Sequence, residues 1–136
     1  MRAIQSYRRT SIESAPNEDV LVLLIEAALR REAAATAAME RGDRVAWVGE
    51  LHVARAVFME LRQALDHAAF PVVAGSLDQT YRWCIQQLTV AGRTGDPELM
   101  AKIHRVTEVL HDTWSRAVAL SREHGEEAPD LVAVAS

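Results

Sequence analysis

Two short glycine–aspartate junctions constrain the fold of this chain more than any other feature of its sequence. Gly42-Asp43 and Gly95-Asp96 each separate two long segments in which apolar residues recur at helical spacing. Glycine suits the left-handed residue that ends a helix, and the aspartate after it can accept hydrogen bonds from the free N–H groups that open the next helix. The sequence therefore predicts two helical hairpins.

The composition agrees with a single all-α domain. The 136 residues are enough to bury one continuous core, 49% of them are apolar, and strand-like alternation is almost missing. The one cysteine, Cys84, has no partner for an internal disulfide, which suits a reducing cytosol. We therefore expect a soluble, cytoplasmic protein.

The charge pattern argues against two kinds of partner. The formal net charge is −4, and the 15 lysines and arginines are dispersed along the chain rather than gathered in a basic stripe. No uncharged run approaches the roughly 20 residues that a membrane-spanning helix requires. We expect neither nucleic-acid binding nor membrane insertion.

Local signals divide the chain into three parts. Residues 1–16 form a polar and basic N-terminal segment that is expected to be mobile, 17–123 the helical region and 124–136 a short flexible tail. The first helix is expected to start at the N-cap residue Asn17 and to continue through good helix formers to Met39.

The second helix, expected from Arg44 to Ala68, has the clearest apolar period. Its seam alternates steps of four and three residues and comprises Trp47, Leu51, Ala54, Phe58, Leu61, Leu65 and Ala68. A second apolar set widens the arc beyond this seam, as either a bundle core or a partner surface would require. That set comprises Val53, Val57 and Ala64.

The third and fourth helices repeat this period. Pro71 can occupy the first turn of the third helix, whose seam is Leu77, Tyr81, Cys84, Leu88 and Ala91. The predicted seam of the fourth helix is Leu99, Ile103, Val106, Leu110, Ala117 and Leu120, with polar Thr113 in the same register. Helices of similar length joined by short connections predict an antiparallel up-down four-helix bundle.

No residue pattern indicates an enzyme, a metal site or a cofactor. A carboxylate-bridged metal pair needs Glu-x-x-His on two helices, and only Glu108 and His111 have that spacing. Cys84 lies on an apolar stripe with no neighbouring base, as a core thiol would. His52 leaves a histidine phosphotransfer bundle as an alternative, although the lysine and small glycine that usually follow such a histidine are missing from His52-Val53-Ala54-Arg55-Ala56.

One set of residues recurs with the spacing of a known family. The set comprises Tyr7, Ile12, Val20-Leu21-Val22-Leu23-Leu24, Gly42-Asp43, Leu51, Ala54, Val57, Phe58, Glu60, Leu61, Leu65, Asp66, Leu77, Tyr81, Ile85, Leu88 and Asp112-Thr113-Trp114. In this spacing the chain resembles FliS, the export chaperone family of bacterial flagellin. It departs from the family pattern at Ile25-Glu26-Ala27, at Trp47-Val48 and at Phe70-Pro71, as a divergent member would.

The resemblance implies a chaperone function. Flagellin's C-terminal segment is disordered when free and amphipathic, and a chaperone that holds it along apolar grooves prevents premature polymerisation and aids secretion through the flagellar type III export apparatus. The candidate flagellin-binding residues are Tyr7, Ile12, Val53, Val57, Ala64 and Tyr81. Each of them could instead complete the bundle core. In FliS-like proteins the mobile N-terminal segment, here with Tyr7 and Ile12, can cover the groove when no client is bound.

Two other functions stay open at this point. A phosphotransfer bundle would use His52, and a dimerising structural bundle would consume the wide apolar arc of the second helix in self-association. Some relatives also contact the export apparatus or an anti-sigma factor, so the resemblance allows an export gate protein as a further partner. The chain is expected to be a monomer or a weak dimer.

Overall fold

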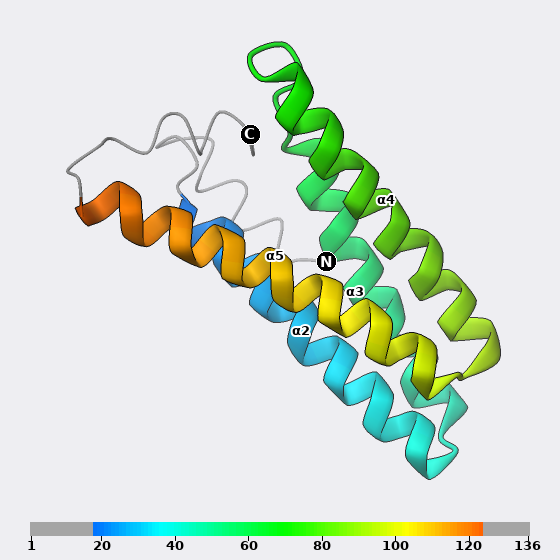
Figure 1. The fold of residues 1–136 in the computed structure, drawn as a ribbon. Helices are drawn as coiled ribbons and strands as arrows, with labels where there is room; N and C mark the ends of the chain where they lie inside the picture. The colour runs from blue at the N-terminus through cyan, green and yellow to red at the C-terminus, as the bar shows by residue number, and fades with distance from the viewer. Residues whose placement is uncertain (1–17, 124–136) are drawn as a thin grey trace.

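Four helices make up the part of the chain that the computed structural model describes, residues 18–123. They are α2 (Glu18–Arg41), α3 (Arg44–Gln63), α4 (Pro71–Thr94) and α5 (Pro97–Glu123). Figure 1 shows a helical bundle with short connections, so the predicted all-α fold is confirmed. The predicted N-cap residue Asn17, the N-terminal segment and the C-terminal tail lie outside the described residues.

The two glycine–aspartate junctions form as predicted. Gly42 and Gly95 have φ values of 73° and 65°, in the left-handed region that glycine occupies without a steric cost. Asp43 Oδ1 accepts a hydrogen bond from the N–H of Ala46 at 3.2 Å, and the aspartate of the second junction accepts one at 2.9 Å from a backbone N–H in the first turn of α5. Each junction thus ends one helix and caps the next.

The second helix is shorter than predicted. α3 ends at Gln63 with Ala64 as its C-cap residue, whereas the apolar period suggested a helix to Ala68. A turn replaces the expected last helical turn, because Asp66 Oδ1 accepts a hydrogen bond from the N–H of Ala69 at 2.9 Å and so offers the backbone a local alternative to the helix. Ala68 is exposed in this turn and does not belong to the seam.

A single core runs through the bundle. Pro71 opens α4 as predicted, and most of the predicted seam residues of α3 and α4 are buried. The largest fully buried apolar side chains come from all four helices and are Ile25, Leu51, Phe58, Tyr81, Leu88, Met100 and Ile103. Burying a large apolar side chain contributes about 1.5–3 kcal/mol, so this cluster dominates the packing of the bundle.

The buried stripe of α5 differs from the predicted seam. Its buried positions are Met100, Ile103, Thr107, Leu110, Trp114 and Val118. Of the predicted seam residues, Leu99 and Val106 are only partly buried and Leu120 is exposed. The helix is therefore rotated about its axis relative to the predicted register, which turns Val106 to the edge of the core.

The helices pack unequally around the core. α2 packs against α3 and α5, α3 also packs against α4, and α4 and α5 have the least extensive contact of the neighbouring pairs. In Figure 1 the helices converge at the end that carries the two glycine–aspartate junctions, and α4 and α5 diverge towards the other end. Within residues 18–123, none of the helices is long and apolar enough to cross a membrane.

Candidate functional site

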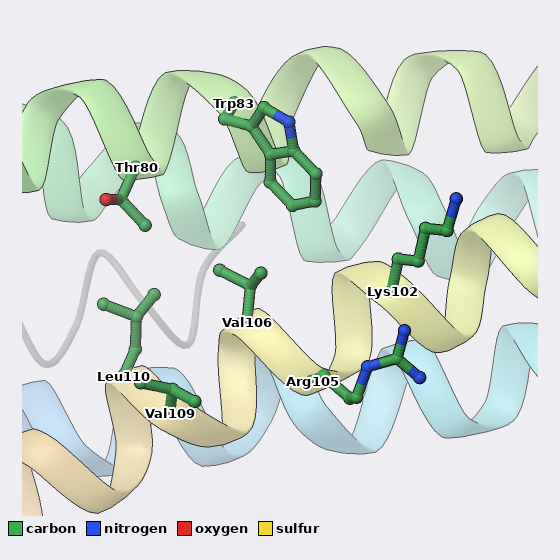
Figure 2. Close-up of a pocket in the computed structure, with 7 residues that line it drawn as sticks. All are labelled: Thr80, Trp83, Lys102, Arg105, Val106, Val109 and Leu110. Carbon is green, nitrogen blue, oxygen red and sulfur yellow. The ribbon is translucent and has the colours of Figure 1, made fainter.

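A groove lies between α4 and α5, with a volume of ≈ 560 Å³. It is lined by Thr80 and Trp83 from α4 and by Lys102, Arg105, Val106, Val109 and Leu110 from α5. Figure 2 shows Thr80 and Trp83 projecting from α4 towards Val106 and Leu110. A smaller hollow beside it is also lined by Thr80, Trp83 and Val106, so the depression continues along α4. We call this surface the α4–α5 groove.

The α4–α5 groove combines an apolar floor with a cationic edge. Trp83 and Val106 are partly buried against the core and Leu110 is buried, so these three side chains form the floor. Lys102 and Arg105 are exposed on α5 beside them. Such a surface suits an amphipathic segment that carries apolar side chains and some negative charge.

The groove exists because two helices carry apolar side chains outside their buried stripes. Trp83 directly precedes the fully buried Cys84 of α4 and therefore lies at the side of the core. On α5, Val106 precedes buried Thr107, and Val109 is 64% exposed. Because α4 and α5 diverge, these side chains face a space that no other helix of the described chain fills.

Polar contacts position α5 against α2. Oε1 of the fully buried Glu32 lies 2.9 Å from Nδ1 of His104, and Oε2 accepts a hydrogen bond from Thr107 at 2.8 Å. Further along the same interface, Nε2 of His111 lies 2.9 Å from Oε2 of Glu26. Burial raises the pKa of Glu32 to about 8. These contacts fix the rotation of α5 and, with it, the lining of the α4–α5 groove.

Two of the predicted partner-binding residues are core residues. Val57 has 0% and Tyr81 1% of its surface exposed. The Tyr81 ring centroid lies 6.1 Å from that of Phe58. Burial raises the pKa of Tyr81 to about 12, against a smaller lowering by the Trp114 side chain. In this conformation neither Val57 nor Tyr81 is open to a partner.

Of the other four predicted residues, the structure describes two. Val53 is half-buried on α3, and Ala64 is half-buried at the C-cap of that helix. Tyr7 and Ile12 lie outside the described residues. The four described members of the predicted set therefore contribute nothing to the lining of the α4–α5 groove, and their role in partner binding stays a prediction.

Sequence reasoning placed Val106 and Leu110 in the core seam and did not identify the groove. The signal that could have found it is an apolar residue directly beside a seam position. Trp83 precedes Cys84 and Val109 precedes Leu110, so each helix has an apolar arc wider than its seam. That these two arcs face one another depends on the rotation of α5, which the sequence pattern did not predict.

The structure also shows where the residues considered for phosphotransfer and thiol chemistry lie. His52 is exposed on α3, and its Nδ1 lies 3.4 Å from Nη2 of Arg55. Cys84 is buried, and burial raises the pKa of its thiol to about 12, far from the range of a reactive thiolate. Across residues 18–123, no group of three or more His, Cys, Asp or Glu side chains could hold a metal ion.

The fold and the groove define the class of protein, a helical bundle with an apolar groove on its surface. Residues 1–121 match the family described as flagellar protein FliS. The chain is 24% identical over 118 residues to the flagellar secretion chaperone FliS of Vibrio cholerae, covering 84% of this chain and 87% of that protein. It is 29% identical over 120 residues to the flagellar secretion chaperone FliSB of Pseudomonas aeruginosa, covering 84% of this chain and 94% of that protein.

The chain belongs to the FliS family, and the resemblance inferred from its sequence is confirmed. FliS is a family of chaperones and not of enzymes, so the prediction that this protein is not an enzyme is also confirmed.

Proposed function

We propose that this protein is a cytoplasmic flagellar secretion chaperone that binds the disordered C-terminal segment of flagellin along the α4–α5 groove. Membership of the FliS family supports the chaperone role, and both relatives are named flagellar secretion chaperones. The observation that supports the site is the apolar floor of Trp83, Val106 and Leu110 between two diverging helices.

The groove offers the contacts that a disordered amphipathic client needs. A segment that becomes ordered on binding loses conformational entropy at a cost of about 2–5 kcal/mol, which the contact must offset. Each Å² of apolar surface removed from water contributes about 25 cal/mol. Covering Trp83, Val106 and Val109 therefore contributes binding free energy that offsets the entropy cost of ordering the client. A client held in this way is unable to polymerise and stays unfolded enough for secretion.

Titration of a synthetic peptide of flagellin's C-terminal segment into the full chain tests the proposal by calorimetry. We expect one-to-one binding. Val109→Asp should weaken it by about tenfold or more, because the substitution replaces an apolar contact with a charged carboxylate that the client would have to desolvate. Val72→Asp is the matched control, because Val72 is 83% exposed at the start of α4 and lies outside the groove. This control should bind like the unmodified chain.

Two results would change the proposal in different ways. Absence of binding by any flagellin peptide would remove the function. If Val109→Asp left peptide binding intact and Val53→Asp weakened it, the chaperone function would stand. The binding site would then lie on the α3 surface that the sequence predicted.

We also propose that the loaded chaperone contacts an export gate protein. A pull-down that compares the free chaperone with its flagellin complex tests this second partner. Light scattering over a range of concentrations tests the expected monomer or weak dimer, since a stable dimer at low concentration would favour a structural bundle.

A further inference from the structure

A second groove, between α3 and α4, is bordered by basic side chains. It has a volume of ≈ 260 Å³, and its border carries Arg44, His52 and Arg55 of α3 and Arg93 of α4. Among the described residues that line it, none is acidic. This concentration of positive charge contrasts with the net charge of −4 of the whole chain. We call this surface the α3–α4 basic groove.

The arginines of this groove differ from those elsewhere on the bundle. Arg31, Arg62 and Arg116 each pair with a carboxylate of a neighbouring residue. Arg44 and Arg93 are exposed, and in the part of the chain that the structure describes no carboxylate lies within ion-pair distance of either. Their guanidinium groups are therefore available to carboxylates of another molecule.

Neutral partners hold the third arginine at the edge of the groove. Arg55 Nη1 donates a hydrogen bond to Thr89 Oγ1 at 3.0 Å, and Nη2 lies 3.4 Å from Nδ1 of His52. The lining between the basic side chains is apolar and includes the exposed Val48 and the buried Leu88. The groove thus presents positive charge around an apolar centre.

We propose that the α3–α4 basic groove binds an acidic amphipathic helix of a partner protein, with its apolar side chains on Val48 and its carboxylates on Arg44, Arg55 and Arg93. Arg44 and Arg55 lie about three turns apart on α3, a span of about 16 Å at 1.5 Å per residue. The partner helix should therefore carry carboxylates about three turns apart, on either side of an apolar centre.

This site is distinct from the proposed flagellin site. The α3–α4 basic groove and the α4–α5 groove share no lining residue, although α4 contributes to both. A nucleic acid suits the basic groove less well, because an apolar floor offers no contact to phosphates and the net charge of −4 repels a polyanion at longer range.

Fluorescence anisotropy with a defined probe tests the proposal on the full chain. The probe is a capped, fluorescein-labelled helical peptide of about 14 residues, with leucines at every third or fourth position and glutamates near both ends. We expect the probe to bind saturably. Arg44→Glu/Arg93→Glu should weaken this binding by about tenfold or more, and raising NaCl from about 50 to about 500 mM should weaken it as well. The matched control is Arg30→Glu/Arg82→Glu, which changes the net charge equally at exposed positions outside both grooves.

Three outcomes would overturn the proposal. The first is equal binding of a peptide that carries lysines in place of the glutamates, and the second is unchanged binding of the probe to Arg44→Glu/Arg93→Glu. The third is displacement of the probe by a single-stranded oligonucleotide at a lower concentration than the unlabelled peptide requires. Arg44→Gln/Arg93→Gln removes the charges without reversing them and should show an intermediate loss if the double glutamate variant fails to fold. Binding of the flagellin peptide should be unchanged in either variant, so a failure here is separable from a failure of the proposed function.

Discussion

The hydroxyl of Thr107 on α5 donates a hydrogen bond of 2.8 Å to Oε2 of Glu32 on α2, and both side chains are fully buried. The other carboxyl oxygen, Oε1, lies 2.9 Å from Nδ1 of His104. Burial favours the neutral acid and raises the Glu32 pKa from 4.5 to about 8, against the smaller lowering by Thr107. Near neutral pH the carboxyl group therefore holds a proton, which Oε1 can share with Nδ1 of His104.

This buried acid should make the stability of the bundle depend on pH. The folded state binds the Glu32 proton more tightly than the unfolded chain, so the stabilisation is complete below pH 4.5 and is lost as the pH rises towards about 8. One such group changes the free energy of unfolding by at most about 1.4 kcal/mol per pH unit in that window. Urea denaturation at intervals across the window should show a decreasing free energy of unfolding.

Glu32→Gln is the matched variant for this prediction. The amide keeps the shape of the side chain, can accept a hydrogen bond from Thr107 and can donate one to His104, but it does not ionise. Its free energy of unfolding should fall less steeply with pH than that of the unmodified chain. Parallel curves for the two proteins would show that another group causes the pH dependence.

Trp47 closes the junction end of the bundle over Gly95. Its Nε1 donates a hydrogen bond to the carbonyl oxygen of Gly92 at 3.1 Å, and a Cβ built on Gly95 would lie 2.7 Å from the Trp47 ring. Alanine at Gly95 would meet this ring and would also adopt an unfavourable positive φ. We expect Gly95→Ala to lower the free energy of unfolding by about 2–4 kcal/mol in chemical denaturation.

Gly42→Ala separates the steric contact with Trp47 from the cost of placing alanine at a positive φ. Gly42 has a similar φ, 73°, but nothing lies within 4 Å of the Cβ that alanine would add. Its replacement should cost only about 1 kcal/mol, the cost of the backbone conformation alone. Equal losses at the two glycines would mean that Trp47 moves aside freely. If the Trp47 ring is the obstacle, Trp47→Phe should reduce the difference between the losses of unfolding free energy caused by Gly95→Ala and Gly42→Ala.

The parts of the fold that depend on local chemistry were predictable from the sequence. The left-handed glycines, the aspartate at Asp43 that caps α3 and the proline at Pro71 that opens α4 each act within a few residues of the chain. The end of α3 was not predicted, because the apolar period continues to Ala68 while the Asp66 side chain closes a turn first.

The rotation of α5 and the α4–α5 groove required the structure. Thr107 and Glu32 are polar, so a sequence pattern places them at the surface, and only their contact across two helices allows both to be buried. This contact turns Val106 out of the predicted seam. The groove then depends on how far α4 and α5 diverge, which is a property of tertiary packing and leaves no periodic signal in either helix.

The thiol of Cys84 should react only when the bundle opens. Cys84 is buried, and burial raises its pKa to about 12, so almost no thiolate is present at pH 8. Labelling with a disulfide reagent should be slow in native buffer and rapid in denaturant. Because Cys84 is the single cysteine, the signal reports one site. Rapid labelling of the native protein would contradict this and would indicate that α4 separates readily from the core.

Tyr81→Phe distinguishes a core role from a partner-binding role for this residue. The variant removes a buried hydroxyl that interacts with the Trp114 side chain, and we expect the free energy of unfolding to fall by about 0.5–1.5 kcal/mol. Since Tyr81 is almost completely buried, the affinity for a flagellin C-terminal peptide should be unchanged at a temperature where both proteins are folded. A parallel loss of affinity would instead show that the client reaches the Tyr81 hydroxyl, which requires α4 and α5 to part on binding and would support the sequence-based assignment of Tyr81 to the partner surface.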